Sequence, residues 1–114
     1  MKTFSLSQNQ VYNKTKVTAE VIMETPFSKE IRLLLYKNQF MKEHKTSFPI
    51  TIEVFQGAIN LSVEGESKVM LAGDMIYLDA DVPHSLKAKA NSIVRLTLSK
   101  FDKIERIEEL INGT

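Results

Sequence analysis

The chain of 114 residues contains no cysteine and no tryptophan. Without cysteine, the protein can form no disulfide, use no thiol nucleophile and hold no zinc through sulfur. Its charge is nearly balanced, with 15 Lys and Arg against 14 Asp and Glu. The basic residues are scattered rather than clustered, so we expect neither a nucleic-acid partner nor binding to an anionic membrane.

Long hydrophobic runs are also missing. No apolar segment approaches the roughly 18–20 residues that are needed to cross a bilayer, and residues 1–10 lack the apolar core and the cleavage site of a signal peptide. We therefore expect a cytoplasmic protein. A phosphate-binding loop, a dinucleotide fingerprint and a GxSxG elbow are absent as well, which leaves the identity of any catalytic residues unknown.

What the sequence does contain is apolar alternation with a period of two residues. Ile, Leu and Val alternate with other residues over 50–54, 59–63 and 93–98, which is typical of half-buried β-strands. Turn residues separate many short runs of this kind, so the pattern predicts an all-β sandwich or barrel, and the length fits one domain over residues 1–114. Further strands are expected over residues 16–23, 30–36, 67–71, 75–78 and 84–88.

The end of the chain changes to a helical period. Apolar residues recur at helical spacing after Asp102, and Glu105 completes a pattern similar to a capping box. Gly113 is placed to end the helix in a left-handed conformation. We predict a short α-helix over about residues 102–112, whose apolar stripe must pack on the barrel or on another subunit because so short a helix is marginal alone.

The only two histidines stand in two recognisable frames. The first frame runs from Asn38 through His44 to Gly57, and the second runs from Gly73 to His84. Together these frames resemble the two motifs of the cupin superfamily, in particular the small single-domain cupins. Asn38 takes the place of the opening glycine of the first motif, which it can do because Asn tolerates a left-handed turn. His44 and His84 match the first and the last histidine of the family.

The chain departs from the cupin motifs at several positions. Thr46 stands where the family has its second histidine, and Ile50 stands where it has a glutamate. In the second motif Asp79, Asp81 and Ala88 replace a proline, a glycine and an asparagine. Two of the four expected metal ligands therefore survive.

The resemblance covers about residues 29–100 and implies the fold. It indicates a small cupin-type jelly-roll β-barrel, to which the C-terminal helix is appended. Because lone small cupins often form homodimers by exchanging edge strands, it also implies a homodimer, and an exposed N-terminal sheet edge would supply a physical motive.

Strand parity extends this interpretation to individual side chains. The ligand positions fall on even-numbered residues, so Ile52 and Val54 should face the interior and Glu53 should face outward. Arg95 should face outward for the same reason, because the apolar residues beside it alternate with it. Glu53 is therefore not expected to complete a metal site, and Arg95 is not expected to bind a carboxylate or phosphate inside the barrel.

We predict that His44 and His84 face each other across a mostly apolar cavity. The candidate pocket residues are His44, His84, Thr46, Met41, Met75 and Tyr77. Our first hypothesis is a module in which the two histidines anchor a small-molecule ligand. The alternative is a metal-dependent enzyme of the dioxygenase, isomerase or decarboxylase kind, in which they bind a weakly held divalent transition metal.

A third hypothesis is a filled scaffold that acts through its surface. Loss of the glutamate and of the second histidine favours the first and third hypotheses, because transition-metal sites usually need at least three protein ligands. Retention of the two motif histidines favours the first hypothesis and the enzyme. The ligand or substrate itself is not encoded in any motif that we recognise.

Overall fold

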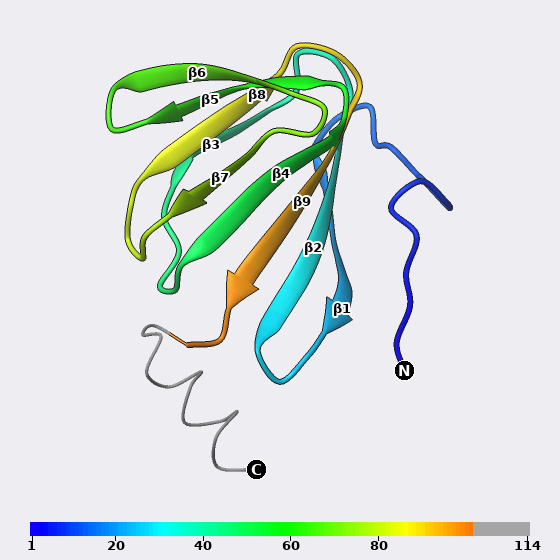
Figure 1. Ribbon diagram of the computed structural model, residues 1–114. Coiled ribbons are helices and arrows are strands. Elements are labelled where there is room, and N and C mark those ends of the chain that lie inside the picture. The colour runs from blue at the N-terminus through cyan, green and yellow to red at the C-terminus, as the bar shows by residue number, and fades with distance from the viewer. Residues whose placement is uncertain (102–114) are drawn as a thin grey trace.

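The computed structural model describes residues 1–101, which form nine β-strands in two facing antiparallel sheets (Figure 1). The all-β prediction is confirmed, while the predicted helix over residues 102–112 lies outside the described residues. No helix in residues 1–101 is long and apolar enough to cross a membrane. The strands are β1 (Thr18–Glu24), β2 (Ser28–Leu35), β3 (Phe40–His44), β4 (Ile50–Gln56), β5 (Ala58–Val63), β6 (Glu66–Leu71), β7 (Met75–Leu78), β8 (His84–Ala88) and β9 (Ser92–Ser99).

The strand order brings distant parts of the chain together. The larger sheet has the order β1-β2-β9-β4-β7, and the smaller sheet has the order β3-β8-β5-β6. Consecutive strands therefore often lie in different sheets, and the chain crosses repeatedly from one sheet to the other (Figure 1). This arrangement places β3 directly beside β8, so the strands that carry the two histidines are neighbours.

The hydrophobic core lies between the two sheets, and strand parity predicted it correctly. Ile50, Ile52 and Val54 are buried in a single apolar cluster that also includes residues of the smaller sheet. Glu53 faces outward and forms an ion pair with Arg95 on β9, with 3.0 Å between Glu53 Oε1 and Arg95 Nε. The alternation of apolar and polar residues thus separates the barrel interior from its outer surface.

Left-handed backbone conformations occur at the turns that frame the two motifs. Asn38 has a φ of 75°, as the sequence predicted, and Gly57 has a φ of 88°. At Gly57 a Cβ atom would also collide with the carbonyl oxygen of Asn91 and with Ser92 Oγ. Only glycine meets both requirements at that position, because it tolerates a positive φ and has no side chain.

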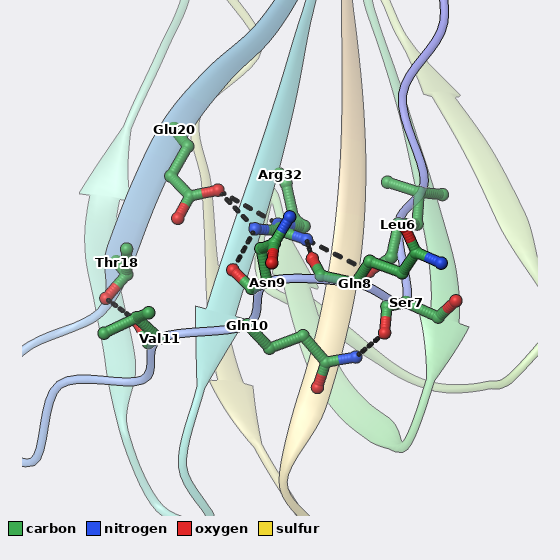
Figure 2. Close-up of polar contacts among 9 residues, drawn as sticks. All are labelled: Leu6, Ser7, Gln8, Asn9, Gln10, Val11, Thr18, Glu20 and Arg32. Atoms are coloured by element: carbon green, nitrogen blue, oxygen red, sulfur yellow. Dashed lines mark hydrogen bonds and ion pairs between the residues drawn. The ribbon is translucent and has the colours of Figure 1, made fainter.

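A buried arginine fixes the N-terminal segment to the larger sheet (Figure 2). Arg32 on β2 is only 2% exposed, and its Nε and Nη2 donate to Glu20 Oε2 at 3.0 and 2.7 Å. Nη1 donates to the carbonyl oxygens of Leu6 and Gln8 at 3.3 and 2.7 Å, and Nη2 donates to that of Asn9 at 3.1 Å. These five hydrogen bonds match the five N–H groups of a guanidinium, so the buried charge is fully satisfied.

The same segment makes further contacts along the chain. The rings of Tyr12 and Tyr36 lie 5.0 Å apart, and Gln39 Nε2 donates to the carbonyl oxygen of Asn13 at 2.6 Å. Residues 1–17 contain no helix or strand, and residues 6–9 among them nevertheless cover Arg32 on the outer face of β2. We call residues 1–17 the N-terminal strap.

Candidate functional site

The two histidines meet where β3 ends and β8 begins. His44 and His84 are directly opposite in the register of these antiparallel strands, so both side chains project from the same face of the smaller sheet. That face is the inner one, because Leu86 and Ala88 lie two and four residues after His84 on the same face of β8 and belong to the core. The ring centroids lie 4.4 Å apart with an angle of 59° between the planes. The structure therefore brings the two predicted histidines together, while the cavity between them stays a prediction.

A β-bulge sets the direction of the His44 side chain. Met41 is opposite Leu86, yet His44 is opposite His84, so β3 has one more residue than β8 between the two pairs. The additional residue changes the parity of the strand. Met41 and His44 can consequently both face inward, and Met41 is half-buried against the core. A regular strand would have turned one of the two side chains outward.

Backbone carbonyl groups hold both imidazoles in the same way. His44 Nδ1 lies 2.9 Å from the carbonyl oxygen of Lys42, and His84 Nδ1 lies 2.9 Å from that of Val82. A carbonyl oxygen only accepts hydrogen bonds, so each Nδ1 must carry the hydrogen. Sequence reasoning did not predict these acceptors, because backbone groups leave no residue signature. Pro83 was the one local signal, since it restrains Val82 to an extended conformation.

The two histidines differ in their exposure to solvent. His84 is 2% exposed, whereas His44 is half-buried. Burial lowers the pKa of His84 below its usual value because it penalises the charged form; the hydrogen bond to Val82 opposes this shift, and the nearby His44 adds to it. His84 is therefore neutral at physiological pH, and His44 is the member of the pair that solvent reaches.

Two chain crossings lie next to the histidine pair. Residues 45–49 lead from His44 into β4, and residues 79–83 lead from β7 into His84 (Figure 1). The backbone N–H of Asp81 donates to the carbonyl oxygen of Thr46 at 2.8 Å and ties the two crossings together. Val63 is opposite His84 on β5 and is half-buried against the core. The site therefore consists of two polar rings with apolar side chains beside them.

Residues 1–101 do not provide the ligands of a typical resident metal site. Thr46 Oγ1 donates to the carbonyl oxygen of Phe48 at 2.8 Å and so serves its own loop, and Ile50 is an apolar core residue. Among residues 1–101, no group of three or more His, Cys, Asp or Glu side chains is placed to hold a metal ion. Two imidazoles fall short of the three protein ligands of a typical zinc or non-haem iron site.

Two of the predicted pocket residues lie outside the barrel. Met75 and Tyr77 are 60% and 58% exposed, and the inward-facing residues of β7 are instead Ile76 and Leu78. Tyr77 uses its hydroxyl group to donate to Asp79 Oδ1 at 2.9 Å, and this hydrogen bond raises the pKa of Tyr77. The prediction that Met75 and Tyr77 line the interior was wrong, because successive side chains of a strand point to opposite faces and Ile76 and Leu78 occupy the inner one.

The larger surface hollows lie away from the histidines. One of 440 Å³ is lined by Phe4 and Leu6 of the N-terminal strap together with Glu30 and Arg95 of the larger sheet. Another, of 580 Å³, lies along residues 11–20. Neither histidine lines these hollows. The candidate site is therefore the place where the two imidazoles meet, and His44 is its half-buried, solvent-accessible member.

Comparison with known proteins identifies the fold. No protein-family model matches the chain, and no curated protein matches it in sequence. Among solved structures, an RmlC-like cupin from Desulfovibrio desulfuricans is 18% identical with a TM-score of 0.81, over 87% of this chain and 96% of the other. KdgF from Halomonas sp. is also 18% identical, with a TM-score of 0.73 over 91% and 99% of the two chains.

A third similar structure is an uncharacterized double-stranded β-helix protein from Klebsiella pneumoniae. It is 16% identical with a TM-score of 0.75, over 87% of this chain and 89% of the other. The TM-scores establish the fold, and sequence identities this low establish no activity. The predicted resemblance is confirmed at that level: the chain forms a small cupin-type domain.

Proposed function

We propose that this cupin-type domain binds a small organic molecule at the end of its barrel, with His44 and His84 as polar anchors. The observation that carries the proposal is the inward-facing pair of imidazoles with ring centroids 4.4 Å apart. A typical small-molecule site combines mostly apolar walls with a few convergent polar groups. Val63 and the neighbouring core residues supply the apolar walls here.

The donor set argues against the metal-dependent alternative. An enzyme of that kind needs further ligands at the positions of Thr46 and Ile50, and the Thr46 hydroxyl donates within its own loop while Ile50 lies in the core. A metal held by two imidazoles alone would exchange readily. The filled-scaffold hypothesis gives no role to a paired polar feature inside the barrel, so we rank it below ligand binding.

A fragment screen by protein-observed NMR tests the proposal. We expect small polar fragments to shift the resonances of His44, His84 and Val63, and we expect His44→Ala and His84→Ala to reduce the affinity at least about tenfold, the effect of one lost hydrogen bond to a buried partner. Met75→Ala, which truncates an exposed side chain on the outer face, is the matched control and should bind normally. If the hits cluster elsewhere and both histidine variants bind them normally, the proposed site is wrong.

A further inference from the structure

The hydrogen bonds of the histidine pair restrict the chemistry of its ligand. Each Nδ1 hydrogen is committed to a carbonyl oxygen, that of Lys42 for His44 and that of Val82 for His84, at 2.9 Å in both cases. A neutral imidazole carries one hydrogen on its two nitrogens, so the other nitrogen is an acceptor. In its neutral form each ring therefore presents the lone pair of Nε2 as a hydrogen-bond acceptor.

Two acceptors at one place in the barrel cannot satisfy each other. The rings face the same side of the smaller sheet with centroids 4.4 Å apart, and neither Nε2 carries a hydrogen to give to its neighbour. Within residues 1–101 neither Nε2 is a fully buried atom without a partner, so solvent reaches both nitrogens and an incoming donor can reach them too. The pair is consequently complementary to a molecule that presents two hydrogen-bond donors close together.

Resting on the proposed function, we infer that the site selects a neutral, hydroxyl-bearing molecule with two adjacent donors and an apolar body. An ammonium group would have to enter this apolar environment without an opposite charge beside it, and burying an unpaired charge is costly. A carboxylate or an ether would set its own lone pairs against those of Nε2. The apolar body matches Val63 and the core residues beside the pair.

The first test measures the tautomers directly. Two-bond ¹H–¹⁵N NMR spectra of the uniformly labelled protein, recorded at neutral pH with EDTA present, distinguish a protonated ring nitrogen from a lone pair. We expect both histidines to be protonated at Nδ1. If either ring carries its hydrogen at Nε2, the inferred selectivity is wrong, although ligand binding by the pair could still be correct.

The second test uses two matched probes in the same spectra. Catechol carries two adjacent hydroxyl donors, and 1,2-dimethoxybenzene has the same ring and oxygens without the donors. Benzoate adds an anionic acceptor. We expect catechol to shift the Nε2 resonances of both histidines at concentrations at which the other two probes shift them less than one fifth as far, because they can only accept.

The outcomes separate the two proposals. Equal shifts with catechol and 1,2-dimethoxybenzene would overturn the donor selectivity while leaving ligand binding at the pair intact. No shift of either histidine with any probe up to the solubility limit would overturn both. Loss of the catechol shift in His84→Ala, with retention in Met75→Ala, would place the probe at the pair, because Met75 lies on the outer face of the barrel.

Discussion

His84 is the residue whose surroundings most constrain the site. Its imidazole is 2% exposed and is held by the carbonyl oxygen of Val82. Burial is the largest cause of its lowered pKa. The folded protein therefore keeps His84 neutral under conditions in which the same residue in the unfolded chain begins to take up a proton, at about pH 6.5.

This difference predicts a pH-dependent stability. Because the folded-state pKa is lower than the unfolded one, the contribution of His84 is fully present above about pH 6.5 and is lost as the pH falls through the folded pKa. The free energy of unfolding should therefore fall between about pH 7 and about pH 5, and His84→Gln should flatten that slope. Urea denaturation at several pH values measures it.

The control for this experiment is His44→Gln. That position is half-buried, and burial rather than His44 is the main cause of the His84 shift, so this variant should retain most of the slope. Identical slopes for the native protein and His84→Gln would show that His84 does not bring about the predicted loss.

Gly57 and Gly65 distinguish two ways in which an added side chain can destabilise the fold, namely backbone strain and steric collision. Both have a positive φ, 88° and 82°, but a Cβ at Gly65 meets no atom, whereas one at Gly57 collides with Asn91 and Ser92. We expect Gly65→Ala to lower the free energy of unfolding by about 1–2 kcal/mol through backbone strain alone. Gly57→Ala should lower the free energy of unfolding by at least about 1 kcal/mol more than Gly65→Ala, because of the steric collision. Equal losses in denaturant unfolding would disprove the collision.

At the scale of elements, β3 and β8 determine the site. The bulge in β3 turns both Met41 and His44 inward, and the register places His44 opposite His84. Sequence reasoning predicted that the histidines meet, because the motif frame fixed their positions. It did not identify β3 as a strand, since Lys42 and Glu43 interrupt the apolar alternation within only five residues.

The N-terminal strap was not predicted at all, although the sequence held a sign of it. In β2 the residues Leu33, Leu34 and Leu35 are all buried, so the strand is apolar on both faces and requires a cover on the outside as well. An alternating strand needs none. A continuous apolar run in an otherwise alternating sheet is therefore the signal that could have indicated a covering segment.

Arg32 should hold the N-terminal strap on the larger sheet strongly enough that its loss is measurable as a lower free energy of unfolding. Arg32→Met removes five hydrogen bonds and leaves Glu20 without its partner, so we expect a loss of about 2–4 kcal/mol in unfolding free energy. Trypsin should also cut faster at Lys14 and Lys16. The matched control is Arg95→Met, which breaks one partly exposed ion pair and should cost less than about 1 kcal/mol. Equal losses in the two variants would contradict the anchoring role.

At the scale of the whole molecule, strand periodicity and turn chemistry predicted an all-β sandwich or barrel, and the resemblance of the two histidine frames to the cupin motifs implied the cupin type. The alternation placed Ile52 and Val54 in the core and Arg95 outside it, as the structure has them. In β7, Ile76 and Leu78 take the inward positions, so Met75 and Tyr77 lie on the outer face, contrary to the prediction from their residue types. The tautomers of the histidines were beyond prediction, because they depend on a bulge and on a proline turn that orient backbone carbonyl groups.

The sheet edges lead to a prediction about assembly. β1 and β7 are the outer strands of the larger sheet, and Val21 on β1 is exposed. Unpaired strand edges favour association, so we expect a homodimer with about twice the chain mass of 13.0 kDa. Light scattering coupled to size-exclusion chromatography measures this mass, and Val21→Lys should shift the population toward the monomer. A native protein that stays monomeric at high concentration would contradict the prediction.

The most direct test of the central claim is the metal content of the native protein. The claim is that His44 and His84 serve an organic ligand rather than a resident metal, because Thr46 and Ile50 supply no further ligands. Elemental analysis should use protein purified without chelators and without a histidine tag. We predict far less than one transition-metal ion per chain, also after incubation with added metal and desalting. Close to one equivalent of iron, manganese, nickel, copper or zinc, lost in His84→Ala, would contradict the account and favour the metal-dependent enzyme.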